Sequence, residues 1–405
     1  MPRSAAVLPD GSRVTDFVSL GVVASMFPLP RVREILEETG RASQRQRSLP
    51  AHVVVYYVIA LGLFMQVSYG EVLRCLLEGL KWLRFPDRDI RVAGKSGISR
   101  ARSRLGVEPI KRLHDTTVKP IASAGTKGAW YHCWRLVSLD GSTLDVGDTD
   151  ANAKAFGRPK ASRGRSAFPQ IRFVSLVENG THVLFGSACG PFADSEARLA
   201  KKVLPWLSSG MLCLADRYFC SFELWQHARN TGADLLWRIR RNARLEMISR
   251  LPDSSYLSKI YPTTKDRRHD SNGIVVRVVE YKLKTPGSEP LYRLITTILD
   301  PEQAPAADLA ALYHERWEIE TAFDELKTHL RGARNVLRSK TPELVLQEFY
   351  GLLMAHFAVR GIMHEAALKA DIDPDHLSFV HSVRVIRRKL PLFHAFPPSG
   401  ACQLS

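Results

Sequence analysis

Three acidic residues stand where they could share divalent metal ions: Asp140, Asp216 and Glu320. Asp140 follows the short apolar segment Arg135–Leu139, and Asp216 follows the continuous apolar run Met211–Ala215. Both segments have the length and composition of strands. Carboxylates suit Mg²⁺, and a pair of such ions can activate an attacking oxygen and stabilise a leaving one, as attack on a phosphodiester requires. The three acids are therefore candidates for metal-dependent chemistry.

Neither aspartate is decisive alone, because an aspartate after an apolar strand is more often a turn or cap residue than a ligand. The order of the surrounding elements adds information. We expect a first strand ending on the turn Asp140–Ser142, two strands joined by a hairpin containing Asn179-Gly180, a helix, and a further strand. The expected ranges are 135–139, 171–177, 181–187, 194–204 and 211–215.

This order of elements is what a ribonuclease-H-like core would present, which is an argument by fold analogy. In such a core the first and fourth strands lie side by side, so Asp140 and Asp216 would meet in space. The predicted fold class is therefore α/β, with a mixed five-stranded sheet and helices as the catalytic core.

The third acid lies in Ala311–Lys327, which has the composition and period of one helix. At about 100° per residue, Glu320 falls on one side with three other polar residues, beside an apolar stripe. Glu318 and Glu325 are expected to point toward solvent, and Glu315 lies at the other edge of the stripe. The four polar residues are Tyr313, Arg316, Glu320 and Lys327, and the stripe is Leu312, Ile319, Phe323, Leu326 and Leu330.

Glu320 could merely pair with Arg316, four residues away, which is a favourable spacing on a helix. Taken in isolation, that pairing is the better explanation. The grouping of four polar residues on one side favours a ligand role for Glu320.

The spacing tyrosine, two residues, arginine, three residues, glutamate, six residues, lysine resembles the signature of the insertion element four family of bacterial DDE transposases. The resemblance continues at Leu139–Gly141, at Ala215–Phe219, at 338–345 and, more loosely, at Arg47–Pro50. Ser142 stands where the family often has threonine, and Tyr218 where many members have glycine. Neither departure removes a predicted metal ligand.

The resemblance implies that Asp140, Asp216 and Glu320 are catalytic and hold Mg²⁺, with Mn²⁺ as a substitute. It also implies that Tyr313, Arg316 and Lys327 contact DNA phosphate. The expected reactions are hydrolysis that frees a 3′ hydroxyl, then transesterification, directly or through a hairpin intermediate, and joining to target DNA. The enzyme would bind the terminal inverted repeats of its element and act as a dimer on DNA.

The charge of the chain supports a polyanionic partner such as double-stranded DNA, since 57 lysines and arginines face 41 aspartates and glutamates, for a net charge of +16. Two basic clusters are candidates for DNA contact. One is a helix at 96–105 with a serine cap, and the other is a loop between the first core strands; solvent-exposed basic faces are the alternative. Their residues are Arg100, Arg102, Arg104, Arg158, Lys160, Arg163 and Arg165. A third cluster, Arg41, Arg45 and Arg47, is more simply explained by solvent exposure.

More than a hundred residues separate Asp216 from Glu320, which is more than a connection needs. We expect an inserted β domain with strands at 235–240, 274–281 and 292–299. Trp237 in the first of these could stack on a base, although a tryptophan in a strand is usually core. The expected division is a helical DNA-binding domain at 1–125, catalytic core at 126–220 and 306–365, the insertion at 221–305, and a short helical tail at 366–405.

Several other classes of protein do not fit the sequence. The apolar run Val53–Met65 is too short to span a bilayer and reads as a buried helix, and charged residues interrupt the first twenty positions. The six cysteines lack the spacing of a zinc site or disulfide framework. We therefore expect a cytoplasmic protein, associated with the nucleoid when bound to DNA, that has no membrane partner.

Two alternatives remain open. One is a DNA-binding regulator that shares the fold and no longer cuts, and the other is a stand-alone nuclease derived from such an enzyme. The three intact acids argue against the regulator. The signature and the amino-terminal helices argue for transposition over simple cleavage.

Overall fold

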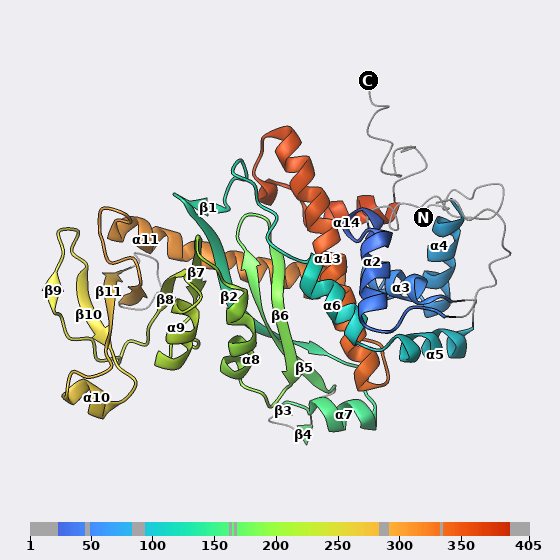
Figure 1. Ribbon diagram of the computed structural model, residues 1–405, viewed down its shortest axis with the longest axis horizontal. Coiled ribbons are helices and arrows are strands. Elements are labelled where there is room, and N and C mark those ends of the chain that lie inside the picture. The colour runs from blue at the N-terminus through green and yellow to red at the C-terminus, as the bar shows by residue number, and fades with distance from the viewer. Residues whose placement is uncertain are drawn as a thin grey trace. The chain divides into compact units, whose positions relative to one another are not determined.

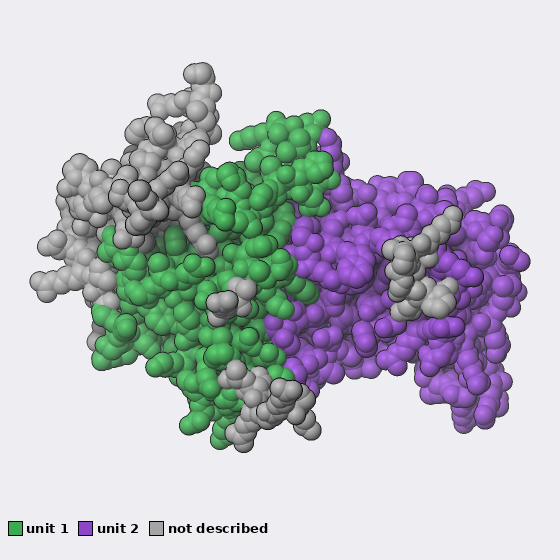
Figure 2. All heavy atoms as spheres, turned by 180° about the vertical axis from the view of Figure 1, so that it is seen from behind, with its two compact units in different colours: residues 1–121, 144–171, 323–405 green, residues 122–143, 172–322 purple. Residues whose placement is uncertain are grey.

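The computed structural model describes residues 23–44, 49–82, 94–161, 164–165, 168–282, 291–332 and 335–388. The chain forms two compact units, coloured separately in Figure 2. Unit 1 comprises residues 1–121, 144–171 and 323–405, and unit 2 comprises residues 122–143 and 172–322. Neither unit is one continuous piece of chain, because the sequence passes between them repeatedly.

Unit 1 is built mainly from helices (Figure 1). The apolar run predicted to form a buried helix does so, as α3, and its residues from Val53 to Leu63 are buried. No helix in the described part of the chain is long and apolar enough to cross a membrane. The helices are α2 (Leu29–Glu38), α3 (Ala51–Leu63), α4 (Tyr69–Trp82), α5 (Lys95–Leu105), α6 (Glu108–Thr117), α7 (Asp150–Phe156), α13 (Pro342–Ala370) and α14 (Phe379–Arg388).

Helix α3 packs against the long helix α13 through glycines on both sides. A side chain at Gly62 would stand 2.9 Å from the backbone of Leu352, and one at Gly351 would stand 2.5 Å from the carbonyl oxygen of Val58. Both distances are below van der Waals contact. The two backbones can approach this closely only because neither glycine carries a Cβ atom.

Unit 2 contains most of a ten-stranded sheet with the order β6-β5-β2-β7-β8-β12-β11-β10-β9, with β1 beside β2 (Figure 1). The strands are β1 (Trp130–Tyr131), β2 (Trp134–Asp145), β5 (Gln170–Glu178), β6 (Val183–Pro191), β7 (Met211–Ala215), β8 (Asp234–Arg238), β9 (Ser249–Arg250), β10 (Tyr256–Ile260), β11 (Ile274–Tyr281) and β12 (Tyr292–Thr296). The fold is thus mixed α/β with a large sheet.

The predicted neighbours β2 and β7 pair in parallel, with Leu139 opposite Ala215, which confirms their expected adjacency. One expectation about β2 is wrong. The strand does not end on a turn at Asp140 but continues to Asp145, so Asp140 lies inside the strand. The apolar run marks only the buried part of the strand. Beyond it, β2 continues mainly as half-buried residues, which the apolar pattern does not reveal.

The predicted hairpin is also present, since β5 and β6 are neighbours joined by residues 179–182. Helix α8 (Glu196–Val203), followed by a 3₁₀ turn (Leu204–Trp206), occupies the expected helix position. Strand β8 was expected to begin the insertion, but it pairs in parallel with β7, with Trp237 opposite Ala215. Trp237 is fully buried and meets Trp225 edge-on, with 5.3 Å between ring centroids, so its role is packing.

The remaining elements of unit 2 extend this sheet and pack against it. Leu212 and Leu214 of β7 share a core cluster with Leu309 and Tyr313, which places α11 and the turn after it against β7. The four free cysteines among the described residues, Cys133, Cys189, Cys213 and Cys220, form no disulfide. The helices are α9 (Phe222–Arg229), α10 (Thr264–Arg268), α11 (Ala306–Leu312) and α12 (Glu318–Asp324), the last of which crosses into unit 1.

The segment predicted as one helix from Ala311 to Lys327 is not a regular α-helix. A 3₁₀ turn at Tyr313–Trp317 separates α11 from α12, and a π-helical turn follows at Glu325–Leu330. A 3₁₀ turn is tighter and a π turn wider than the 100° per residue of an α-helix. The faces derived from a constant angle are therefore displaced.

Two glutamates expected to point toward solvent do not. Glu325 is 5% exposed and accepts hydrogen bonds from Arg360 and His356 of α13. The Glu318 side chain is 12% exposed and accepts a bond of 2.5 Å from the backbone nitrogen of Gly180. Both carboxylates are buried because partners satisfy them, which spacing along the chain cannot reveal.

Gly351→Ala should destabilise the protein by about 1–3 kcal/mol, because the added methyl group must push α13 away from Val58. Gly70→Ala on α4 is the matched control, since a Cβ there meets nothing within 4 Å and alanine favours helix. Urea unfolding of the two variants tests this. Equal midpoints would show that close helix contact at Gly351 is unimportant.

Candidate active site

Two of the predicted acids lie on adjacent parallel strands. Asp140 follows Leu139 on β2 and Asp216 follows Ala215 at the end of β7, and Leu139 and Ala215 are paired across the two strands. The side chains are 23% and 20% exposed, respectively, so both carboxylates are largely buried. Burial of two neighbouring carboxylates requires compensation from a positive charge.

That charge comes from Arg316, whose side chain is 9% exposed. Its Nη1 lies 3.3 Å from Oδ2 of Asp140, and its Nη2 lies 3.4 Å from Oε1 of Glu320. The pairing of Glu320 with Arg316 is therefore real, and the same guanidinium connects it to Asp140. Because 48% of the Glu320 side chain is exposed, this carboxylate remains accessible to a ligand.

Burial and the neighbouring acids shift the pKa of Asp140. Burial raises the pKa of Asp140 to about 6, and the carboxylates of Glu196 and Asp216 add to the rise, while the backbone N–H of Gly141 and the charge of Arg316 oppose it. Burial acts to lower the pKa of Arg316, but its acidic surroundings raise it on balance. The site is thus an acidic cluster that favours a cation.

The residues also fit a divalent metal. Oδ1 of Asp216 is buried and has no hydrogen-bond partner among the described residues, and Arg238 Nη1 is 3.9 Å away, beyond hydrogen-bond reach. A buried carboxylate oxygen without a partner is costly, and a bound cation would satisfy it. The acids offer only oxygen ligands, which suits Mg²⁺ or Mn²⁺.

Tyr313 contacts the strand end that carries Asp216. It is 5% exposed, and its hydroxyl donates to the carbonyl oxygen of Ala215 over 3.3 Å. Burial raises its pKa. The hydroxyl is thus used within the protein, next to Asp216, and the expectation that Tyr313 contacts DNA phosphate does not fit its position.

Lys327 belongs to the other compact unit, within the π-helical turn. Burial lowers its pKa, Arg331 acts in the same direction, and Asp145 and Asp324 oppose the shift. Unit 2 therefore brings together the three acids with Tyr313 and Arg316, whereas Lys327 is a residue of unit 1.

The basic helix α5 presents only part of its predicted surface. Arg100 and Arg104 are exposed and four residues apart, as expected. Arg102 is 3% exposed and donates to Oε1 of Gln347 and to the carbonyl of Leu344, so it anchors α5 to α13 and cannot reach DNA. The helix begins after Gly94, without the predicted serine cap.

The second basic cluster is not simply a loop. Strands β3 (Lys160–Ala161) and β4 (Gly164–Arg165) form a short antiparallel ladder in which Lys160 pairs with Arg165. The side chains of these two residues lie outside the described part, as does Arg163 altogether. Arg158 forms an ion pair with Asp148. Arg41 donates to the carbonyl of Arg104 over 3.2 Å, whereas Arg45 and Arg47 lie outside the described residues.

A fourth carboxylate was missed. Glu196, the first residue of α8, lies so close to Gly141 that a Cβ there would stand 2.7 Å from its side chain. Acids are common in the first turn of a helix, so nothing in the local sequence singled it out. The one sequence feature related to Glu196 is Gly141, because a glycine after Asp140 leaves space for the Glu196 side chain.

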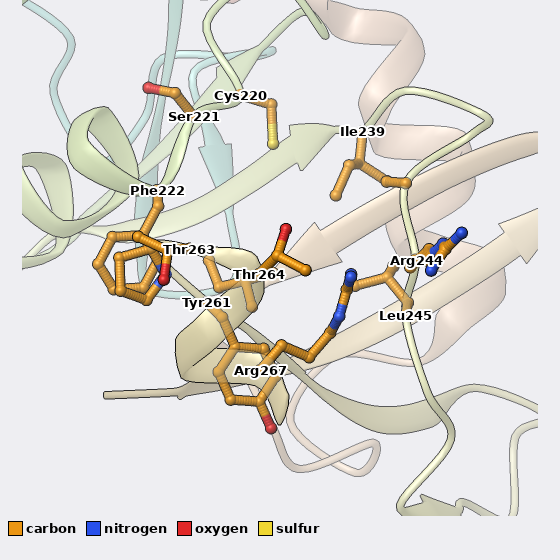
Figure 3. A pocket seen from close by; sticks show the side chains of 13 residues that line it. Cys220, Ser221, Phe222, Ile239, Arg244, Leu245, Tyr261, Thr263, Thr264 and Arg267 are labelled. Carbon is orange, nitrogen blue, oxygen red and sulfur yellow. The ribbon is translucent and has the colours of Figure 1, made fainter. Parts of the chain in front are cut away.

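A separate cavity of about 290 Å³ lies beyond the loop after Asp216 (Figure 3). Its walls include Cys220, Ile239 and Tyr261, with Arg244 and Arg267 as its charged residues. Neither guanidinium forms an ion pair with another described residue, so the lining is positively charged. Burial raises the pKa of Cys220 to about 12, which keeps this thiol protonated and unreactive.

Comparisons with known proteins relate the chain to transposases. Residues 17–115 match the family described as insertion element 4 transposase N-terminal, and residues 132–358 match the transposase DDE domain. Transposase InsG for insertion sequence element IS4, from Escherichia coli K12, is 28% identical over 383 residues, covering 92% of this chain and 83% of InsG. InsZ of the same strain is 24% identical over 234 residues, covering 57% and 75%. The transposase for insertion sequence element IS421 of Escherichia coli is 32% identical over 122 residues, covering 30% of each chain.

Asp140→Asn should raise the free energy of unfolding at about pH 8. The folded-state pKa of about 6 exceeds the ordinary value, so the stability contributed by Asp140 is lost as pH rises from about 4 to 6 and stays lost above. Asparagine mimics the protonated acid, so the variant should regain up to about 3 kcal/mol in free energy of unfolding at about pH 8. Urea unfolding in EDTA at about pH 4 and pH 8 measures this, and a variant less stable than the parent at pH 8 would contradict it.

Proposed function

Because this chain belongs to the insertion element four family of DDE transposases, we propose that Asp140, Asp216 and Glu320 hold two divalent metal ions with which the protein cuts and joins DNA. The main support for this proposal is one acidic cluster. In it, Asp140 lies on β2, Asp216 directly follows the paired strand β7, and Arg316 contacts both Asp140 and Glu320. The family membership gives the class of reaction, and the cluster gives the residues.

The core proposed for this chemistry is ribonuclease-H-like. The strand order β6-β5-β2-β7-β8, with β2, β7 and β8 parallel, supports that assignment. The remaining strands, β9 to β12, correspond to the proposed insertion, and the helices before residue 125 to a DNA-binding domain. The match of residues 17–115 to a transposase amino-terminal family supports the last of these.

Bound Mg²⁺, or Mn²⁺ in its place, would activate the attacking oxygen and stabilise the leaving one. The protein's residues prepare the site for it. Asp140 must lose its proton before it can act as a ligand, and Arg316 occupies the space between two of the acids. When Arg316 yields its carboxylate contacts, its guanidinium can turn to a DNA phosphate, with which it makes forked hydrogen bonds.

The proposed substrate is the pair of terminal inverted repeats of the insertion sequence, cut by hydrolysis and joined to target DNA by transesterification, a cut-and-paste reaction. Pairing two ends requires at least two protomers, so a dimer on DNA is part of the proposal. The +16 charge supports binding of double-stranded DNA. The proposed phosphate contacts are Arg316, Lys327, Arg100, Arg104, Arg158, Lys160, Arg163 and Arg165, without Tyr313 and Arg102.

Glu320→Gln should reduce cleavage of a labelled duplex carrying the element's own terminus by at least ~100-fold. Loss of a residue that only orients a metal ligand already lowers metal affinity or activity by about 10–100-fold, and loss of the ligand itself should cost more. Binding of the duplex should persist. Glu315→Gln is the matched control, since this exposed glutamate lies in the same segment and outside the cluster.

The outcomes separate the alternatives. Equal cleavage by Glu320→Gln and the parent would remove Glu320 from the site. Specific binding without cleavage by the parent would favour a regulator. Cleavage without specificity for the terminus and without joining would favour a stand-alone nuclease.

The Mg²⁺ concentration needed for half-maximal cleavage should rise about tenfold per pH unit below about pH 6, because protons then compete for Asp140. Glu196→Gln should shift this transition to lower pH, since its carboxylate helps to raise the pKa of Asp140. Cleavage titrated with Mg²⁺ between about pH 5 and pH 8 measures both effects. A metal requirement that does not change with pH would contradict the assignment of Asp140 as a ligand.

A further inference from the structure

The hairpin turn between β5 and β6 connects two segments of unit 2 through buried hydrogen bonds that the proposed reaction does not use. Asn179, the first residue of this turn, is fully buried. Its Oδ1 accepts a hydrogen bond of 2.9 Å from the hydroxyl of Ser138, and its Nδ2 donates one of 2.9 Å to the carbonyl oxygen of Glu315. A carbonyl can only accept, so the amide nitrogen must face Glu315 and the orientation of the side chain is fixed.

The two ends of this link lie beside the proposed metal ligands. Ser138 is two residues before Asp140 on β2, so the two side chains share one face of the strand. Glu315 immediately precedes Arg316 and lies five residues before Glu320. One buried amide thus connects the strand that carries Asp140 to the segment that carries Glu320.

The next residue of the turn holds the same segment at a second point. The backbone nitrogen of Gly180 donates to Oε2 of Glu318. Gly180 has φ +78°, and a Cβ there would stand 2.7 Å from the backbone of Gly128 and Ala129. Only glycine fits this position, so the backbone of the turn is held at a fixed distance from Glu318.

The Glu320 segment needs such a link because of where it lies. Unit 2 ends at Ala322, two residues after Glu320, and α12 continues into unit 1. The 3₁₀ turn at Tyr313–Trp317 interrupts the regular helix just before it. Glu320 therefore keeps its place beside the aspartates through contacts within unit 2 and not through a continuous rigid helix.

We propose that Asn179 is a positioning residue for the metal site: its amide fixes the Glu320 segment to the Asp140 strand, so that both carboxylates can bind the same pair of ions. This inference rests on the proposed function. A purely structural amide would stabilise the fold without affecting the metal. The positioning role predicts instead that loss of Asn179 weakens metal binding through Glu320.

The test is Mn²⁺ affinity, measured without DNA from the electron paramagnetic resonance of free Mn²⁺, together with thermal unfolding. Asn179→Ala should weaken Mn²⁺ binding about tenfold, as loss of an orienting partner does for metal ligands. Ser138→Ala, which leaves Asn179 in place, should weaken it in the same direction by a smaller factor. Ser175→Ala is the matched control, because this buried serine of β5 bonds to Phe185 and Ser187 and not to the turn.

A double-mutant cycle identifies the route of the effect. In a Glu320→Gln background, Asn179→Ala should cause no further loss of Mn²⁺ affinity, since the group that it positions is already gone. An equal tenfold loss in that background would overturn the proposal. So would unchanged affinity in both Asn179→Ala and Ser138→Ala, even if thermal stability falls.

The same measurements separate this inference from the proposed function. If Asp140→Asn and Glu320→Gln bind Mn²⁺ as the parent does, the metal site itself is wrongly assigned. If those two variants lose affinity and Asn179→Ala does not, the metal site stands and the positioning role fails. If Asn179→Ala does not fold, Ser138→Ala decides, because it cuts the same link at its other end.

Discussion

Burial of several carboxylates in one place is the constraint on which the rest of unit 2 depends. Asp140 and Asp216 are largely removed from water, and burial is the main cause that raises the pKa of Asp140 to about 6. Arg316 makes the arrangement tolerable by contacting Asp140 and Glu320 at once. Oδ1 of Asp216 still has no hydrogen-bond partner among the described residues, and its nearest positive charge, Nη1 of Arg238, is 3.9 Å away. Under the proposed function, a bound cation would satisfy this oxygen.

The fold meets this constraint with two kinds of support. The two aspartates are positioned by the sheet itself, because the parallel pairing of β2 with β7 fixes both backbones. The Glu320 segment has no strand to hold it. Tyr313 ties it to the end of β7, and the turn at Asn179 and Gly180 ties it to β2 and β5. The irregular helix is therefore held by side chains, which makes its position depend on single residues.

The sequence allowed the strands beside Asp140 and Asp216 and their adjacency to be predicted, because buried parallel strands consist of continuous apolar runs such as Met211–Ala215. It did not show that β8 belongs beside β7 and not to the insertion. It did not reveal the helix faces around Glu320, since a 3₁₀ and a π turn change the angle per residue without any change in composition. Burial of charged groups was equally hidden. Arg102 and Glu325 look like surface residues by type, and only their partners on α13 explain why they are inside.

Glu320 and Glu325 lie on one short segment and contact different partners. Glu325 is paired inside unit 1 with Arg360 and His356, five residues after Glu320 serves the cluster of unit 2. Helix α12 is regular from Glu318 to Asp324, so five steps of about 100° place the two glutamates on different sides of the segment. The π-helical turn begins only at Glu325 and changes the faces of the residues that follow, Lys327 among them. The regular helix therefore lets one short segment present two carboxylates to two separate sets of charges.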